Sequence, residues 1–349
     1  MKIGIGGLPK SDLDEVLINC KDLWHSIRES RLLLLGGTGF VGSWIIATLL
    51  NANRELSLGL KITVLTRDSK RARERFVEKD LSGTNFVEHD LKSGAEINLG
   101  FQDFAIHAAT PSVPQPGFLD KSVAANSTIG GIHLIGKQVL KENPDLRFIH
   151  LSSGAVYGQS NSNLFQFFEK DVGFKNGHRT DYGNLKHDAE RMGMSYFAQK
   201  REQIGNPRLF SFIGPLLALD QHFAVGNFLL DGLNGRAIEI KGNPQSLRSY
   251  MYPTDLVTWL LHILVTPNAG PLNIGGEETI TMFDLASLIA SKTQKQGITI
   301  LNPNAEINCY WPSTQETQKI YRVEQQVSLE DGITRWMAWL KSSQSLKQS

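Results

Sequence analysis

Two residues of one predicted helix have the types and the spacing for proton transfer. Tyr182 and Lys186 lie four residues apart in a helical pattern that opens near Thr180, so their side chains share one face. A lysine ammonium held near a phenol favours the ionised form of the phenol and lowers its pKa. Such a tyrosine can exchange a proton with a substrate alcohol while a nicotinamide carries the hydride. The pair indicates oxidoreductase chemistry, although the same spacing arises by chance in many helices.

A pair of serines offers a further polar group. Ser152 and Ser153 directly follow the segment 147–151, which we expect to be a buried strand of the sheet. Open α/β sheets bind their ligands at the carboxyl ends of parallel strands. A serine pair is also an ordinary polar end of a strand, so its weight depends on the motifs that accompany it.

A glycine-rich turn between a strand and a helix predicts nucleotide binding. Residues 31–35 form a continuous apolar run, the mark of a strand buried on both faces of a parallel sheet. We expect Gly36 to turn the chain out of this strand, Gly39 to admit a pyrophosphate and Gly42 to allow close helix packing. The N-terminus of the following helix would offer free N–H groups to the phosphates. A bare structural turn is the alternative.

The residues after the next predicted strand bear on the choice of cofactor. The segment 61–66 alternates like a strand, and Arg67 and Asp68 follow it directly. Lys70 and Arg71 lie nearby. In a dinucleotide fold an acidic residue here accepts from the 2′-OH of NAD, whereas an arginine accommodates the 2′-phosphate of NADP. The arginine favours NADP over NAD, with the solvated start of a helix as the alternative.

The elements that must position these residues alternate along the chain. Further strands are expected at 85–87 and 104–106, and a helical pattern at 121–140. Ala108 and Ala109 are small, so they leave room for a cofactor across a strand end. This alternation predicts an α/β fold built on a parallel sheet.

Together these motifs resemble the extended short-chain dehydrogenase/reductase family, in its nucleotide-sugar epimerase/dehydratase group. The resemblance covers nearly everything from residue 31 to about residue 290. It implies a Rossmann doubly wound parallel sheet with a smaller C-terminal α/β substrate domain. It also implies a catalytic triad of Ser153, Tyr182 and Lys186.

The resemblance implies further contacts with cofactor and substrate. Asp90 resembles the family's adenine-contacting aspartate, and Asn126 the helix asparagine associated with a proton-relay water. Arg248 resembles the arginine that grips the diphosphate of the sugar nucleotide, a task that suits a bidentate guanidinium. The expected cofactor-binding residues are Gly36, Thr38, Gly39, Phe40, Val41, Gly42, Arg67, Asp90, Leu91, Ala108, Ala109, Thr110, Asn126, Tyr182 and Lys186. The expected substrate-binding residues are Ser153, Tyr182, Arg248 and Ser211, the last standing where asparagine is commoner.

Departures from the family pattern narrow the expected reaction. The family's 4,6-dehydratases usually carry an Asp-Glu pair directly after the catalytic serine or threonine, and its decarboxylases tend to carry a glutamate there. Gly154 and Ala155 follow Ser153, and neither can act as an acid or a base. The resemblance therefore favours an NAD(P)-dependent epimerase, which oxidises and re-reduces one carbon, or a 4-keto-sugar reductase. A 4,6-dehydratase and a non-catalytic dinucleotide-binding protein are the alternatives.

We expect three parts in the chain. Residues 1–30 form a helical extension, whose apolar side chains, Leu13 and Val16 among them, pack on the domain flank rather than serve as a partner-binding arm. Residues 31–214 form the NAD(P)-binding Rossmann domain. Residues 215–349 form mainly the substrate-binding domain, with some strands and helices returning to the first.

Composition limits the expected partners and location. The chain has 349 residues and a net charge of +1, which gives no reason to expect nucleic acid or an anionic membrane as a partner. No apolar run approaches the ~20 residues of a membrane span, and the first thirty residues lack the layout of a signal peptide. Cys20 and Cys309 match no metal spacing, and the histidines form no cluster, so no metal is expected. We expect a cytoplasmic enzyme acting on a nucleotide sugar. The family resemblance implies a homodimer, paired through helices near 120–142 and 181–200.

Overall fold

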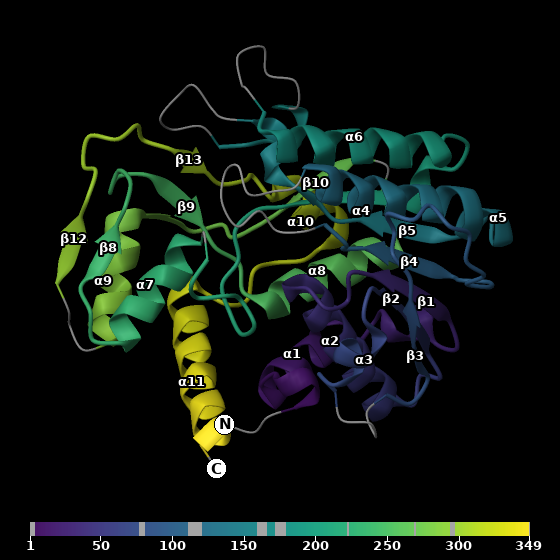
Figure 1. Ribbon diagram of the computed structural model, residues 1–349, viewed down its shortest axis with the longest axis horizontal. Coiled ribbons are helices and arrows are strands. Elements are labelled where there is room, and N and C mark those ends of the chain that lie inside the picture. The colour runs from purple at the N-terminus through teal and green to yellow at the C-terminus, as the bar shows by residue number, and fades with distance from the viewer. Residues whose placement is uncertain are drawn as a thin grey trace.

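The computed structural model describes residues 4–76, 81–110, 121–158, 166–171, 179–221, 223–268, 270–293 and 297–348. Within these ranges, eight strands form one parallel sheet in the order β10-β7-β5-β4-β1-β2-β3, with β6 beside β7 (Figure 1). Its strands are β1 Arg31–Leu35, β2 Lys61–Thr66, β3 Thr84–Glu88, β4 Phe104–His107, β5 Arg147–His150, β6 Ser152–Ser153, β7 Ile204–Leu209 and β10 Pro271–Ile274. This order confirms the predicted Rossmann sheet.

The first strand lies inside the sheet because its side chains are apolar on both faces. Leu32 and Leu34 belong to the core on one side of the sheet, whereas Leu33 and Leu35 belong to the core on the other. All four are fully buried. Because successive side chains of a strand point to opposite faces, a strand covered on both faces must be apolar at every position.

Helices cover both faces of this sheet. Figure 1 shows α4 and α6 on one side and α1, α2 and α8 on the other. The α-helices that pack with the sheet are α1 Lys10–Asn19, α2 Phe40–Leu56, α3 Ser69–Arg73, α4 Lys121–Leu134, α5 Leu140–Glu142, α6 Asp181–Tyr196, α8 Pro253–Val265 and α10 Gln315–Tyr321. Short connecting helices are η1 Ile5–Gly7, η2 Trp24–Ile27, the π-helical turn Ile135–Val139, η5 Gly154–Tyr157, η6 Glu169–Asp171 and η7 Arg201–Gln203.

A smaller half of the molecule packs around a core of its own. Strands β9, β11 and β13 form a sheet in the order β11-β9-β13, and β8 pairs with β12. Leu229 of α7, Leu285 of α9 and Trp336 of α11 lie in the core beneath these strands. The elements of this half are α7 Ala224–Leu233, β8 Ile238–Ile240, β9 Leu247–Ser249, β11 Thr279–Thr281, α9 Met282–Lys292, β12 Ile298–Ile300, β13 Cys309–Tyr310 and α11 Leu329–Gln348. In contrast, α8 and β10 pack in the larger half.

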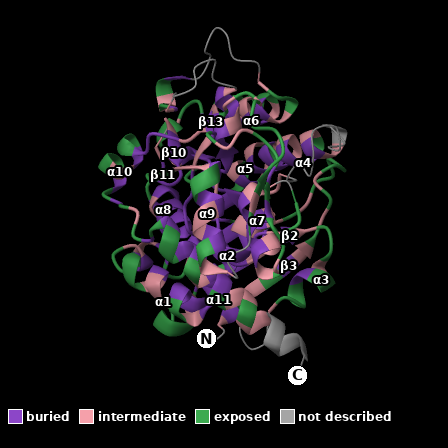
Figure 2. Cartoon of the chain, turned by 90° about the vertical axis from the view of Figure 1, so that its left-hand side faces the viewer, coloured by how far each residue is buried: buried purple, intermediate pink, exposed green. Residues whose placement is uncertain are grey.

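Helix α8 explains where the N-terminal segment lies. All of its residues except His262 are buried, and Figure 2 colours it accordingly. A helix that is apolar all round needs cover on every side. Helix α1 supplies part of that cover, with Leu13 and Val16 fully buried in the same core. The segment before β1 is thus packed into the larger half.

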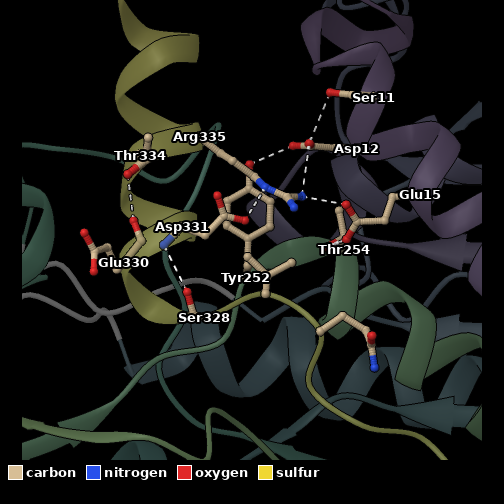
Figure 3. A network of polar contacts seen from close by, with 12 residues as sticks. Ser11, Asp12, Glu15, Tyr252, Thr254, Ser328, Glu330, Asp331, Thr334 and Arg335 are labelled. Atoms are coloured by element: carbon tan, nitrogen blue, oxygen red, sulfur yellow. Dashed lines mark hydrogen bonds and ion pairs between the residues drawn. The ribbon is translucent and has the colours of Figure 1, made fainter.

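A polar network ties α1 to both halves of the molecule (Figure 3). The Tyr252 hydroxyl, just before α8, donates to Asp12 Oδ2 of α1 at 2.7 Å. Thr254 Oγ1 of α8 donates to Glu15 Oε1 of α1 at 2.9 Å. From the smaller half, Arg335 of α11 donates to Glu15 Oε2 at 2.6 Å and lies 3.6 Å from Asp12 Oδ1. The network joins the N-terminal segment, α8 and α11 through charged groups that are largely shielded from water.

The buried Asp12 carboxyl makes stability depend on pH. Burial raises its pKa from 3.8 to about 6, and the bonds from Tyr252 and Arg335 offset only part of that rise. The folded chain therefore keeps a proton that the unfolded chain loses near pH 4, so this contribution to stability is lost as the pH rises through 6. We expect Asp12→Asn to gain stability relative to the natural chain, by about 3 kcal/mol between pH 4 and pH 7.

Urea unfolding of both chains across this pH range measures the effect. Asp220→Asn, which changes an exposed carboxylate, should show a difference from the natural chain that hardly varies with pH. A difference for Asp12→Asn that is equally constant would contradict the assignment.

Candidate active site

Three polar side chains meet where β6 lies beside the start of α6. Ser153 belongs to β6, and Tyr182 and Lys186 belong to α6. The Ser153 hydroxyl is close enough to Tyr182 to lower the pKa of that phenol. Lys186 Nζ lies 6.0 Å from the centre of the Tyr182 ring. The structure thus brings together the residues predicted to form a triad.

The first turn of α6 is adapted to this close approach. Thr180 caps the helix, because its Oγ1 accepts from the Gly183 N–H at 3.1 Å. A Cβ at Gly183 would lie 2.3 Å from the carbonyl oxygen of Ala155, so a larger residue would push α6 away. Glycine next to Tyr182 therefore lets the phenol reach Ser153.

A buried ion pair fixes α6 against the sheet behind the triad. Arg208 of β7 donates from Nε and Nη2 to the two carboxylate oxygens of Glu190, at 2.9 and 2.7 Å. Glu190 Oε1 also accepts from Ser152 Oγ at 2.6 Å. The bidentate geometry satisfies both charges in the interior. Because α6, β6 and β7 share this contact, the relative positions of Ser153 and Tyr182 are fixed.

One backbone oxygen and one hydroxyl oxygen hold the ammonium group of Lys186. Its Nζ donates to the Leu151 carbonyl at 2.6 Å and to Thr110 Oγ1 at 2.8 Å. The Thr110 hydroxyl lies 3.0 Å from that of Thr128 on α4. Lys186 is 3% exposed, and burial lowers its pKa to about 7. The lysine is thus oriented before any ligand binds.

The sequence-based expectation for the Tyr182 pKa was wrong for the free protein. Burial raises this pKa to about 12, and the nearby Ser153 hydroxyl offsets only part of that rise. The ammonium of Lys186 is directed at the carbonyl of Leu151 and at Thr110, and burial favours its own neutral form. Tyr182 is therefore a neutral phenol at pH 7, poised to donate a proton.

The space around the glycines of the turn between β1 and α2 shows where a dinucleotide would fit. Gly36 has φ +83°, and a Cβ there would lie 2.6 Å from the backbone of Ala108 and Ala109. A Cβ at Gly42 would lie 2.2 Å from the carbonyl oxygen of Gly36. Gly39 differs, because it is exposed and a Cβ there would meet only one protein atom, at 3.6 Å. Packing explains two of the glycines, and the open space at Gly39 suits a pyrophosphate. Thr38 lies in this turn, and Phe40 and Val41 begin α2.

Of the two residues that follow β2, one caps a helix and the other is exposed to solvent. The Asp68 carboxylate accepts from the Arg71 N–H at 2.8 Å and caps α3, so this carboxylate is already engaged within the protein. Arg67 is exposed beside it. A further arginine, Arg75, donates to the Thr38 carbonyl and to Ser43 Oγ. Nothing in the sequence pattern singled out Arg75, since only the fold brings it against the glycine turn.

The other predicted cofactor residues lie around the ends of β3 and β4. Asp90 Oδ1 accepts from the Lys92 N–H at 3.0 Å. The carbonyl of Leu91 packs against Gly130 of α4, where a Cβ would lie 2.3 Å away. Asn126 is exposed on α4. The α4 side chain that contacts Thr110 is Thr128, so the sequence pattern located the helix but not this residue.

The predicted substrate residues lie on the smaller half and on the segment after β7. Arg248 of β9 donates from Nη1 to the carbonyls of Leu247 and Asn308, both at 2.7 Å. The carbonyl of Ser211 accepts from the Met251 N–H at 3.1 Å, so Ser211 lies beside the segment that follows β9. Opposite Arg248 in the neighbouring strand stands Tyr310, which sequence reasoning missed.

Two kinds of feature are absent from the described part of the chain. Across the ranges that the structure describes, no group of three or more His, Cys, Asp or Glu side chains is arranged to hold a metal ion. In the same ranges, no helix has the length and apolar character needed to cross a membrane.

Comparisons with known proteins agree with this geometry. The NAD dependent epimerase/dehydratase family matches residues 32–275. UDP-glucuronic acid decarboxylase 1 of Danio rerio is 27% identical over 313 residues, which are 87% of this chain and 71% of that protein. The decarboxylase 1 of Xenopus tropicalis is 28% identical over 265 residues, 74% of this chain and 59% of that protein.

Solved structures share the fold. An epimerase of Methanothermobacter thermautotrophicus has a TM-score of 0.74 at 20% identity, covering 97% of each chain. UDP-glucose 4-epimerase of Thermotoga maritima, solved with UDP-glucose, has a TM-score of 0.72 at 18% identity, covering 90% of this chain and 99% of that one. The family match includes most strands of the sheet and all three residues of the triad. The chain therefore belongs to the NAD-dependent epimerase/dehydratase family and is an enzyme of the extended short-chain dehydrogenase/reductase type.

Proposed function

We propose that this enzyme is an NAD(P)-dependent nucleotide-sugar epimerase or 4-keto-sugar reductase. The observation that carries the proposal is the space beside Ser153. A Cβ at Gly154 would lie 2.6 Å from the Tyr310 hydroxyl and 2.7 Å from the Phe210 ring, so the protein itself fills the place of a side chain. Gly154 and Ala155 therefore supply no carboxylate at the two positions directly after Ser153, and this favours oxidation and reduction at one carbon over loss of water or of a carboxylate.

Each residue of the triad has a distinct role in this proposal. Tyr182 exchanges a proton with the reacting oxygen of the sugar, as a donor when a ketone is reduced and as an acceptor when an alcohol is oxidised. Ser153 hydrogen-bonds the same oxygen. Lys186 would hold the ribose of the cofactor and favour the phenolate of Tyr182. When bound, the nicotinamide cofactor supplies hydride transfer at the sugar carbon.

The substrate would be held by the smaller half. Arg248 is proposed to bind the diphosphate of the nucleotide sugar, because a guanidinium matches two phosphate oxygens at once. Its carbonyl partners, Leu247 and Asn308, leave its other nitrogens available to an anion. Burial lowers the pKa of Arg248, so a diphosphate would relieve an electrostatic cost. The homodimer and the cytoplasmic location stay predictions.

The reaction can be tested while the sugar is still unidentified. Mass spectrometry of nucleotides that copurify with the enzyme would identify candidates. UDP-glucuronic acid, UDP-glucose and dTDP-glucose, the compounds named for its relatives and neighbours, would then be incubated with enzyme and NAD or NADP. We expect NMR to show inversion at one sugar carbon or, when a 4-keto sugar nucleotide is supplied with NADH or NADPH instead, reduction of its ketone to an alcohol. A 4-keto-6-deoxy product would indicate a dehydratase, and release of carbon dioxide a decarboxylase; either would overturn the proposal.

The preference between NADP and NAD is proposed to depend on Arg67. Asp68 is engaged in capping α3, whereas Arg67 is exposed beside the site. If Arg67 meets a 2′-phosphate, Arg67→Ala should weaken NADP binding by about 1–3 kcal/mol, the range for charged hydrogen bonds, and leave NAD binding nearly unchanged. Calorimetric titration with each cofactor measures both affinities.

A matched control separates this effect from a loss of positive charge in general. Arg201 is exposed in η7, before β7 and so at the opposite end of the parallel strands. Arg201→Ala should leave both affinities unchanged. If Arg67→Ala weakens the binding of NADP and of NAD equally, or changes neither affinity, Arg67 is only part of a solvated helix start.

A further inference from the structure

An arginine that follows α3 reaches back to the turn between β1 and α2. Arg75 is exposed and lies two residues beyond the end of α3. Its Nη1 donates to the Thr38 carbonyl at 2.5 Å and to Ser43 Oγ, in the first turn of α2, at 3.2 Å. Ser43 Oγ donates in turn to the Gly37 carbonyl at 3.4 Å. One guanidinium nitrogen therefore joins the glycine turn to the start of α2.

Core packing holds the backbone that carries Arg75. The adjacent residue, Phe76, packs against the core of the larger half, and its ring lies 6.3 Å from that of Phe86 in β3. The Phe76 N–H donates to the Arg73 carbonyl at 2.9 Å. A Cβ at Gly6 would lie 3.1 Å from the Phe76 ring, so the N-terminal segment lies directly against this side chain. The contact between Arg75 and the turn thus starts from an anchored backbone.

The bond from Arg75 completes the hold on the peptide group between Thr38 and Gly39. The N–H of this peptide, from Gly39, donates to the Gly36 carbonyl at 3.2 Å, and its carbonyl, from Thr38, accepts from Arg75. Because a peptide group is planar, bonds at its two opposite ends fix its orientation. The next carbonyl, that of Gly39, accepts from the Ser43 N–H at 2.9 Å. The backbone is therefore held on both sides of Gly39.

This hold falls on the part of the turn that a pyrophosphate would approach. Gly39 is exposed with open space beside it, whereas Gly36 and Gly42 lie close against other backbone atoms. Glycine loses more backbone freedom on becoming ordered than any other residue. A turn that has to become ordered when its ligand binds loses affinity, whereas a turn that is ordered beforehand does not. We therefore expect the bonds of Arg75 to increase the affinity for a dinucleotide.

We propose that Arg75 is a positioning residue of the cofactor site, whose guanidinium holds the Thr38–Gly39 peptide ready for the pyrophosphate of a nicotinamide dinucleotide. The inference deepens the proposed function and rests on it for the cofactor. Its signature differs from the one expected of Arg67. A 2′-phosphate is present in NADP alone, whereas the pyrophosphate is common to NADP and NAD. Arg75 should therefore support the binding of both cofactors to the same extent.

Calorimetric titration tests this signature. Arg75→Ala should weaken the binding of NAD and of NADP by the same factor, about tenfold, as expected for the loss of a charged hydrogen bond that orders the turn. Without cofactor, the thermal unfolding of this variant should hardly differ from that of the natural chain, because Arg75 is exposed. Arg75→Lys keeps the charge but replaces the planar fork by a single ammonium, so it should recover only part of the affinity.

A second measurement needs no cofactor. Hydrogen exchange followed by NMR reports how often the N–H groups of the turn open. In Arg75→Ala the amides of Gly39 and Ser43 should exchange on the order of tenfold faster than in the natural chain, because the free energy of opening falls by a similar amount. The amides of β1 should exchange at the same rate in both chains.

Arg73→Ala is the matched control. Arg73 is exposed at the end of α3, and its guanidinium lies over the Phe86 ring, 5.3 Å from the ring centre. This variant removes the same charge from the same segment and should leave both affinities and the exchange of Gly39 unchanged. Equal losses of affinity in Arg73→Ala and Arg75→Ala would indicate a general effect of charge and would overturn the inference.

The outcomes separate this inference from the proposed function. A loss of affinity for NADP alone in Arg75→Ala, or an unchanged exchange rate of Gly39, would overturn the positioning role. A natural chain that binds neither NAD nor NADP would refute the cofactor of the proposed function. In that case the exchange rate of Gly39 would still decide whether Arg75 holds the turn.

Discussion

Replacing Tyr182 by phenylalanine is expected to lower turnover by roughly 10²–10⁴-fold, the contribution of a positioned general acid or base. The change removes the hydroxyl with its transferable proton and keeps the aromatic ring. Cofactor affinity should hardly change, because the ring still fills its place beside Lys186. Turnover and cofactor affinity are measured on one preparation, with the nucleotide sugar identified by the product assay.

Tyr196→Phe provides the control on the same helix. The Tyr196 hydroxyl contacts His133 of α4 at 2.6 Å, far along α6 from the triad. This variant should keep its turnover. A Tyr182→Phe enzyme with nearly full activity on the identified substrate would show that another group moves the proton.

The other two triad residues should respond differently. Ser153→Ala should slow turnover without touching cofactor affinity, whereas Lys186→Ala should damage both, because one ammonium is proposed to serve ribose binding and phenolate stabilisation. Since the three residues act as a unit, the loss of turnover in a double variant should be much smaller than the product of the losses in the two single variants.

A methyl group at Gly39 is expected to abolish tight cofactor binding in a protein that remains folded. The backbone at Gly39 has φ −77° and ψ 177°, which alanine adopts without strain. The added Cβ would meet one protein atom at an ordinary 3.6 Å, so the free energy of unfolding should change by no more than about 1 kcal/mol. A pyrophosphate that approaches this backbone would instead meet the methyl group. Affinity for NAD and NADP should fall at least tenfold, or about 1.4 kcal/mol.

Gly42→Ala is the contrasting variant in the same turn. Its Cβ would lie 2.2 Å from the carbonyl oxygen of Gly36, so the turn and α2 must separate. We expect this variant to lose both stability and cofactor affinity. Thermal unfolding and calorimetric titration of the two variants distinguish the cases. Unchanged affinity in Gly39→Ala would mean that the cofactor does not cross the turn at this glycine.

Local patterns in the sequence were sufficient for the sheet, whereas the triad was predicted from local patterns together with the family resemblance. A strand covered on both faces has to be apolar at every position, which is why 31–35 could be recognised and bounded. The glycines of the first turn and the four-residue spacing of Tyr182 and Lys186 are equally local, because each reflects the geometry of a single turn or helix. The serine pair 152–153 could be placed because parallel strands end at one edge of the sheet, and the family resemblance selected Ser153 from the pair.

The tertiary structure alone decided which distant groups complete the site. The Tyr310 hydroxyl lies beside Gly154 only because β13 pairs with β9, and no spacing along the chain encodes that pairing. Arg75 reaches the Thr38 carbonyl by the fold of the segment after β2. The Tyr182 pKa was misjudged for the same reason. The spacing within a helix predicts that a lysine lies near the phenol. Burial, which raises the pKa of the phenol, instead depends on all the residues that pack over it.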